Sequence, residues 1–466
     1  MQKVALHNLG CKVNSYEIEV MQQNLSENGY EIVPFAEKAD IYIINTCTVT
    51  NIADRKSRQM LHRAKQKNPD AIVVAVGCYV QTGKEDVLKD DSIDLAIGNN
   101  RKKDLVPILE AFMQERDKTL HGTSVIDVNN TYEYEEMILK QTGDRTRACI
   151  KIQDGCNQFC SYCVIPYARG RVRSRRPEDV LHEIRELVKA GYREIVLTGI
   201  HISSYGIDFE DEAWQTGECR IHCREDGVRR DYTGSSKLID LIERIHEVEN
   251  LDRIRIGSLE PRIVTAENAA RLAALPKLCP HFHLSLQSGC DETLRRMNRH
   301  YTAGEYSKSV ELLRKAFGRV AITTDVIVGF PGETDEEFET TKAFLNQVNF
   351  FEMHIFKYSK RAGTRAAVMP GQVPDSVKTL RSNELLQLEK EQSGAFRREY
   401  LGHEAEVLFE EVKVIAGSRY LLGHTKDYVK VAVPEENASG RTGINCITQV
   451  EVKSILTDEI LLANCL

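Results

Sequence analysis

The chain has 466 residues, of which 42% are hydrophobic and 28% charged, and its formal net charge is −7 at pH 7. This length exceeds what one hydrophobic core organises, so it predicts two to four domains of ordinary globular composition. No apolar run is long enough to span a bilayer, and the negative charge argues against a chain that binds nucleic acid through bulk positive charge.

The thirteen cysteines are an odd number, which favours metal sites and buried thiols over a disulfide framework. The first residues contain no apolar segment followed by a small-residue cleavage site. We therefore expect a cytoplasmic protein with no membrane partner, whose thiols stay reduced.

Residues 1–115 alternate short apolar strands with helical segments. Strands are expected at 3–9, 41–45, 71–76 and 94–98. This alternation predicts an α/β fold, here a doubly wound parallel sheet. The mixed polar and acidic residues 116–144 predict a linker.

A second alternation occupies residues 145–399. Its strands are expected at 148–153, 194–199, 253–258, 282–286, 321–330 and 351–358. Six such units predict a partial parallel (β/α)6 barrel, with its chemistry at the carboxyl ends of the strands. The charged stretch at about 208–234 predicts a surface insertion; its Cys219, His222 and Cys223 are potential metal ligands, although three such residues on one loop are more often incidental.

A long charged helix at about 376–399 leads into residues 400–466, where the rhythm changes. Alternating strands are expected at 404–412, 428–433, 448–456 and 459–465. This pattern predicts a small β-barrel as the third domain.

Cys156, Cys160 and Cys163 form a C-x3-C-x2-C motif after the first strand of the second domain. A four-iron cubane is normally held by four cysteines, so three thiolates leave one iron for a non-protein ligand. The alternative is a structural zinc site, which takes four ligands. Cys149 is the available fourth ligand, but it lies inside an apolar strand. The motif resembles the signature of the radical S-adenosylmethionine (SAM) enzymes, in which SAM binds the open iron.

Cys11, Cys47 and Cys78 each follow one of the first three expected strands. In an open parallel sheet the carboxyl ends of the strands face a common crevice. Three thiolates at that edge predict a second four-iron cluster, again with one iron free of protein ligands. The alternative is that the three cysteines are small buried hydrophobic residues. This interpretation is weaker, because each cysteine is next to a Gly or Thr that lets the backbone approach closely.

Several longer motifs resemble one family along nearly the whole chain, the insertion excepted. LGCKVNSYEIE, INTCTVTNIADRKSRQ and VAVGCYVQ look like the N-terminal domain of the radical SAM methylthiotransferases. GCNQFCSYCVIPYARGRVRSRRPE, HFHLSLQSGCDETLRRMNR and TDVIVGFPGETDEEF look like their radical SAM domain, and residues 400–466 are similar to their RNA-binding TRAM barrel. LGCKVNSYE resembles the branch that acts on N6-threonylcarbamoyladenosine (t6A) at position 37 of tRNA; other branches typically read GCQMN or GCPKN.

The resemblance implies that a methylthio group replaces the C2 hydrogen of the modified adenosine. In the family scheme one SAM methylates a sulfur carried by the N-terminal cluster, and a second SAM gives the radical that activates C2. It also implies tRNA as a partner and an electron donor such as flavodoxin or ferredoxin. Residues expected to contact SAM are Tyr162, Thr198, Gly199, Gln287, Asp325 and Gly329. The chain has TGIH where the superfamily often has Gly-Gly-Glu, which puts an acidic contact there in doubt.

Two basic segments are expected to bind RNA. The first contains Arg169, Arg171, Arg173, Arg175 and Arg176, and the second, on the helix after Cys47, contains Arg55 and Arg58. Arginine offers a planar fork for phosphate, although a charge run is as often a solvated face. The C-terminal barrel is acidic overall, so any grip on RNA requires a local basic face.

Two alternative functions stay open. The first, within the same family, is methylthiolation of isopentenyladenosine-37 in tRNA or of an aspartate in a ribosomal protein. The second, outside the family, is that of a non-catalytic, cysteine-rich RNA-binding protein that holds zinc.

Overall fold

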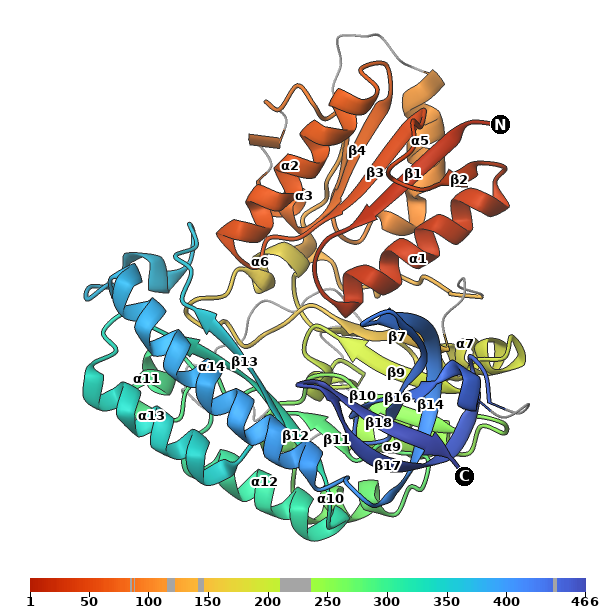
Figure 1. Ribbon diagram of the computed structural model, residues 1–466. Coiled ribbons are helices and arrows are strands. Elements are labelled where there is room, and N and C mark those ends of the chain that lie inside the picture. The colour runs from red at the N-terminus through yellow and green to blue at the C-terminus, as the bar shows by residue number, and fades with distance from the viewer. Residues whose placement is uncertain (84–85, 88, 115–121, 141–145, 210–235, 439–441) are drawn as a thin grey trace.

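The computed structural model describes residues 1–83, 86–87, 89–114, 122–140, 146–209, 236–438 and 442–466. Three parts are visible in Figure 1: an N-terminal α/β domain, a central curved α/β domain and a C-terminal β-barrel. The potential ligands Cys219, His222 and Cys223, with nearly all of the predicted insertion, lie outside the described residues. No helix among the described residues has the length and apolarity needed to cross a membrane.

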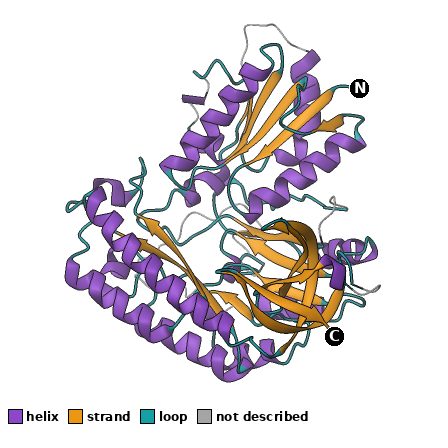
Figure 2. Cartoon of the chain, in the orientation of Figure 1, coloured by secondary structure: helices purple, strands orange, loops and turns teal. Residues whose placement is uncertain are grey.

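The N-terminal domain is a six-stranded parallel sheet covered by helices on both faces (Figure 2). In sheet order its strands are β2 (Glu31–Val33), β1 (Lys3–Asn8), β3 (Ile41–Thr46), β4 (Ile72–Gly77), β5 (Leu95–Ile97) and β6 (Gly122–Ser124). Its helices are α1 (Lys12–Glu27), α2 (Asn51–Lys67), α3 (Cys78–Thr82) and α5 (Leu105–Gln114). Every residue of β3 and β4 is buried, as expected for central parallel strands. The predicted doubly wound sheet is confirmed.

The segment predicted as a linker is packed against both domains. Its β6 adds a strand to the N-terminal sheet, and Met137 and Leu139 are buried. The Leu139 amide donates to the Glu183 carboxylate of the central domain at 2.6 Å. The acidic residues of this segment suggested an exposed linker. The Glu135 carboxylate is nevertheless buried, and it accepts a hydrogen bond from the Lys103 backbone N–H.

The central domain is a partial barrel. One sheet has the order β10 (Arg253–Ile256), β9 (Glu194–Gly199), β7 (Arg147–Asp154) and the antiparallel edge strand β8 (Arg173–Ser174). The other has the order β11 (His281–His283), β12 (Ala321–Val328) and β13 (Glu352–Lys357). Parallel bridges from Ile254 to Leu278 and from Leu259 to Leu284 join the two sheets. The six predicted parallel strands are all present.

The helices of the central domain lie outside its sheets, except α6 (Ile165–Arg169), which lies beside α3 at the junction with the N-terminal domain (Figure 1). The others are α7 (Pro177–Lys189), α9 (Lys237–His246), α10 (Ala266–Ala273), α11 (Asp291–Arg296), α12 (Ala303–Phe317) and α13 (Asp335–Val348). The long α14 (Asp375–Arg398) then leads to the C-terminal barrel.

The C-terminal domain is a closed five-stranded barrel in the order β14-β15-β16-β18-β17. Its strands are β14 (Glu404–Ile415), β15 (Ser418–Thr425), β16 (Lys430–Pro434), β17 (Ile447–Thr457) and β18 (Ile460–Cys465). The sequence did not predict β15, which contains Gly423. A Cβ at Gly423 would lie 2.2 Å from the Leu408 carbonyl oxygen, so the closeness of β14 requires glycine there.

The turn between β15 and β16 docks against the first residues of the central strands. The guanidinium groups of Arg147 and Arg255 lie 5.1 Å and 4.6 Å from the centre of the Tyr428 ring. Arg253 donates to the His424 carbonyl oxygen at 2.9 Å. The C-terminal barrel therefore covers the end of the central barrel opposite to the carboxyl ends of its strands.

Candidate functional site

Cys11, Cys47 and Cys78 lie at the carboxyl ends of three neighbouring parallel strands, β1, β3 and β4. Glycine precedes two of them for steric reasons. Gly10 has φ +117° and Gly77 has φ +99°. A Cβ at Gly10 would lie 3.2 Å from Cys47 Sγ, so the chain before Cys11 passes directly over Cys47. The three strand ends converge in the structure, as the sequence predicts.

The three thiols are close enough to influence one another. Burial and, to a lesser degree, the neighbouring Cys78 and Cys11 raise the pKa of the Cys47 thiol to about 11. Cys47 and Cys78 are buried, whereas Cys11 is exposed at the rim. Metal binding at such thiols has to displace their protons.

Cys156, Cys160 and Cys163 lie on a tight loop that follows β7. Gly155 begins the loop with φ +72°, and a Cβ there would lie 1.7 Å from the Arg171 carbonyl oxygen. The Cys156 amide donates to the Gly170 carbonyl, and the Cys163 amide to the Cys160 carbonyl, both at 3.0 Å. Burial and the neighbouring Cys160 raise the pKa of the Cys163 thiol to about 12.

Each triad offers three sulfur donors, one fewer than a structural zinc site or a cubane held only by cysteines takes. Three thiolates are the donor set that holds a four-iron cluster and leaves one iron for a non-protein ligand.

Each triad has one arginine that donates to a thiol sulfur. Arg169 Nε lies 3.3 Å from Cys78 Sγ, and Arg299 Nη1 lies 3.2 Å from Cys160 Sγ. A guanidinium beside a thiolate offsets part of the negative charge of a thiolate-bound cluster. Arg299 was not singled out in the sequence, because nothing in its neighbourhood marks it as a partner of Cys160.

Arg169 also belongs to a buried charge network between the two α/β domains. Its guanidinium contacts Glu17 at 2.8 Å and Asp154 at 3.2 Å, and Lys102 and Lys151 are also paired with Glu17. Burial alone would raise the pKa of Glu17, but Arg169, Lys102 and Lys151 hold that pKa well below its usual range. The network fixes α1 of the N-terminal domain against β7, next to both triads.

The prediction that Arg169, Arg173 and Arg175 bind RNA is wrong. All three are almost completely buried. Arg173 donates to the Arg169 carbonyl, and Arg175 pairs with Glu183 and Glu136. These guanidinium groups are therefore not accessible to an RNA phosphate.

The other predicted RNA ligands remain accessible. Arg55, Arg58 and Arg176 are exposed, and Arg171 is partly exposed. The Arg171 guanidinium lies 4.6 Å from the centre of the Phe159 ring, and the same ring meets Tyr167 edge-on at 5.9 Å. Tyr167 is 49% exposed, so an arginine and an aromatic ring share the surface beside the Cys156–Cys163 loop.

Two residues predicted to contact SAM, Thr198 and Gly199, lie next to that loop at the end of a single strand, β9. Thr198 is buried and Gly199 partly exposed at the end of β9. A Cβ at Gly199 would lie 3.0 Å from Gln153 Oε1, and Gln153 donates to the carbonyl oxygens of Asp154 and Gly155. Tyr162 packs edge-on against Phe330 with ring centres 6.3 Å apart.

Of the remaining predicted SAM ligands, Gln287 follows β11, Asp325 lies on β12 and Gly329 directly follows β12. Gln287 has φ +73°, a costly conformation for a side-chain-bearing residue that occurs mainly at functional sites. Its amide donates to the carbonyl oxygen of Asp325. Gly329 has φ +70° and its amide donates to Glu333 at 2.7 Å, so this amide serves the turn itself.

A buried carboxylate lies beside His201 of the TGIH segment. Glu260, on the loop after β10, is 3% exposed, and its Oε2 lies 3.2 Å from His201 Nε2. Burial alone would raise its pKa, but His201, Arg299 and Arg262 lower the pKa of Glu260 to about 2. Gln158 of the Cys156–Cys163 loop also reaches this carboxylate, at 3.5 Å. Sequence analysis missed Glu260 because it is distant along the chain.

Two family models match the chain, one in each of its two α/β domains. Residues 150–345 match the Radical SAM superfamily. Residues 3–98 match the Uncharacterized protein family UPF0004.

Several curated proteins are similar along most of the chain. The threonylcarbamoyladenosine tRNA methylthiotransferase MtaB of Bacillus subtilis is 40% identical over 92% of this chain and 90% of its own length. The MtaB of Thermotoga maritima is 34% identical over 99% and 96%. The tRNA-2-methylthio-N(6)-dimethylallyladenosine synthase of Moorella thermoacetica is 35% identical over 86% and 85%.

Among solved structures, the radical S-adenosylmethionine methyltransferase TsrM from Kitasatospora setae, with cobalamin and a [4Fe-4S] cluster bound, superimposes with a TM-score of 0.57. The match covers 79% of this chain and 77% of that chain at 16% identity. It shows a shared fold.

Proposed function

This chain belongs to the radical SAM tRNA methylthiotransferase family, and we propose that it transfers a methylthio group to C2 of t6A at position 37 of tRNA. The observation that carries this proposal is the meeting of two cysteine triads at one domain junction, where Arg169 touches both Cys78 and the network behind β7. The aromatic C2–H bond has no useful acidity, so proton transfer by side chains does not activate it.

We assign Cys156, Cys160 and Cys163 to the radical SAM cluster. The auxiliary cluster is assigned to Cys11, Cys47 and Cys78. When bound, two [4Fe-4S] clusters and two SAM supply the radical that activates C2 and the methylated sulfur that replaces its hydrogen. The protein contributes three thiols to each cluster and an arginine donor beside each, and it fixes the two triads relative to each other through the charges around Glu17.

The SAM site is proposed to lie at the carboxyl ends of β9 and β11. Thr198 and Gly199 border the cluster loop, and Gln287 holds a strained backbone at the end of β11. The Glu260 carboxylate, kept ionised by His201, is the group that best fits the positively charged amino group of SAM. Tyr162 is proposed to limit the adenine side of the site.

RNA is proposed to bind across the domain junction. Arg55 and Arg58 on α2 and Arg171 and Arg176 after the cluster loop offer positive charge on the two sides. The exposed ring of Tyr167 beside Arg171 supplies a surface on which a splayed base can stack. Flavodoxin or ferredoxin is proposed as the electron donor, and the cytoplasm as the location, because the substrate is tRNA.

A second candidate substrate is the dimethylallyl-modified adenosine, because relatives of 34–35% identity carry that name. Mass spectrometry of tRNA nucleosides from cells with and without the gene separates the two. Loss of methylthiolated t6A with unmodified t6A accumulating supports the proposed function. Loss of the methylthiolated dimethylallyl nucleoside instead, or an unchanged nucleoside profile, contradicts it.

A further inference from the structure

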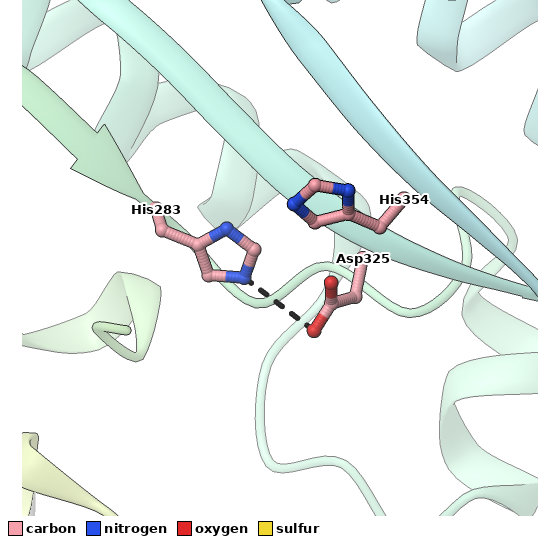
Figure 3. Close-up of side chains that lie close together, drawn as sticks. All are labelled: His283, Asp325 and His354. Carbon is pink, nitrogen blue, oxygen red and sulfur yellow. Dashed lines mark ion pairs between the residues drawn. The ribbon is translucent and has the colours of Figure 1, made fainter. Parts of the chain in front are cut away.

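Three polar side chains from neighbouring strands face one another inside the central domain. His283 comes from β11, Asp325 from β12 and His354 from β13, and Figure 3 shows them turned toward a common point. Their nitrogen and oxygen atoms all lie within 4.8 Å of one another. His283 Nε2 is 3.4 Å from Asp325 Oδ2, and the two imidazole rings are stacked with their centres 5.9 Å apart.

The cluster lies on the inner face of the partial barrel. Phe282, Val326 and Met353 are each adjacent in sequence to one of its members, and all three belong to the core beneath the helices. Because side chains alternate across a strand, the cluster projects to the opposite face. His354 is exposed there, and the side chains of His283 and Asp325 are 14% and 31% exposed.

A chain of hydrogen bonds joins the radical SAM loop to the segment that follows His283. Arg299, which donates to Cys160 Sγ, also donates through Nε to the Tyr301 hydroxyl at 2.9 Å. The Tyr301 hydroxyl in turn donates to the Leu286 carbonyl oxygen at 2.9 Å, three residues after His283.

We propose that His283, Asp325 and His354 bind the threonylcarbamoyl arm of the target adenosine and so select t6A. This inference rests on the proposed function. The arm carries a carboxylate, a hydroxyl and ureido N–H groups. Imidazole N–H groups match the carboxylate, and the Asp325 carboxylate matches the hydroxyl and ureido donors. The hydrogen bond of 3.1 Å between His283 Nδ1 and Thr323 Oγ1 fixes the ring that meets the arm.

The same cluster disfavours a dimethylallyl arm. An apolar arm would cover three polar groups without pairing them, and a site built to hydrogen-bond its substrate discriminates strongly against an analogue that lacks those groups. A bound divalent ion is the alternative occupant, because two histidines and one carboxylate form a known ligand set for transition metals. We favour the arm because the cluster lies on the inner face of the partial barrel, at whose strand ends the SAM site is proposed.

The test compares anticodon stem-loops that carry t6A, dimethylallyladenosine or plain adenosine at position 37. The holoenzyme is prepared anaerobically as wild type, as His354→Gln, as His283→Gln and as the matched control His182→Gln, an exposed residue of α7. Dissociation constants, KM and kcat are measured for each RNA, and 5′-deoxyadenosine formation without RNA is measured in parallel.

The two variants are expected to weaken binding of the t6A stem-loop by about 10- to 100-fold, mainly in KM, and to leave binding of the plain stem-loop unchanged. Their RNA-free SAM cleavage should match that of the wild type and of His182→Gln. Equal losses for all three RNAs, or no loss, would overturn the inference. Loss of t6A affinity in wild type after removal of loosely bound metal, with recovery on adding Zn²⁺ or Mn²⁺, would also overturn it in favour of a metal site. If wild type itself does not prefer the t6A stem-loop, the proposed function fails rather than this assignment.

Discussion

Arg169 Nε and Cys78 Sγ lie 3.3 Å apart although 91 positions separate the two residues along the chain. The same guanidinium contacts Glu17 of α1 and Asp154 at the end of β7. One side chain therefore joins an auxiliary cluster ligand, the N-terminal domain and the loop that carries the radical SAM cysteines. The position of one cysteine triad relative to the other therefore depends on these buried ion pairs.

Replacing Arg169 by lysine should make the auxiliary cluster harder to reduce. Lysine keeps the positive charge but loses the planar fork that reaches Cys78, Glu17 and Asp154 together. A lost hydrogen bond to a ligand sulfur should lower the midpoint potential on the order of 60 mV, the one-electron equivalent of about 1.4 kcal/mol. A redox titration followed by electron paramagnetic resonance measures it. Arg176→Lys, at an exposed position, is the control; equal potentials in both variants would contradict the assignment.

Glu17→Gln should destabilise the protein by about 3–5 kcal/mol, because it leaves buried Lys102, Lys151 and Arg169 without their shared carboxylate. Thermal unfolding of the anaerobic protein checks this. Glu178→Gln changes a carboxylate that is 71% exposed and should have little effect. Similar melting temperatures for the two variants would show that the network does not hold the domains together.

Stability should fall as the pH drops below about 6.5, partly through His281. Burial, Arg255 and Lys12 lower the pKa of this imidazole, which lies 5.1 Å from the Tyr428 ring. The imidazole stays neutral in the native protein because its folded-state pKa is lowered. Below about pH 6.5 the imidazole of the unfolded chain binds a proton, and this favours the unfolded state. The full contribution is present above about 6.5 and decreases by up to about 1.4 kcal/mol per pH unit below it.

His281→Gln should flatten this acid limb. Melting temperatures of wild type and variant, measured between pH 5.5 and 7.5, provide the comparison. Parallel curves would mean that His281 does not contribute to the pH dependence.

Arg55→Gln and Arg171→Gln should each weaken tRNA binding at low salt and reduce the slope of log affinity against log salt by about one. Both side chains reach the surface at the domain junction. Arg271→Gln is the control, because this arginine pairs with Glu243 and Asp240 on the outer helices. A loss as large in the control as in the two variants would argue against a defined RNA surface at the junction.

Much of the fold was readable from the sequence because its signals are local. Each central strand is a short apolar run, and three neighbouring strands of the N-terminal sheet, β1, β3 and β4, are each followed by a cysteine. What failed depends on partners that the local sequence pattern does not reveal. Arg169 and Arg175 look like surface charges until Glu17 and Glu183 are placed beside them, and Glu260 is recognised only when His201 lies against it.

The strand β15 and the segment after residue 116 were missed for a related reason. Gly423 breaks the alternation that marks a strand, and the space beside Leu408 explains it only once β14 is in place. Glu135 gives its segment a polar character although its carboxylate is buried and bonded to the Lys103 amide.

The most direct test of two separate cysteine-bound clusters is a single-turnover assay that measures 5′-deoxyadenosine and methylthiolated t6A in the same anaerobic reaction. Wild type should form both products and bind about eight irons. Cys160→Ala should form neither, whereas Cys47→Ala should retain about four irons, still release 5′-deoxyadenosine and make no methylthiolated nucleoside. Methylthiolated t6A from either variant, or a colourless wild-type protein that binds zinc, would contradict the account.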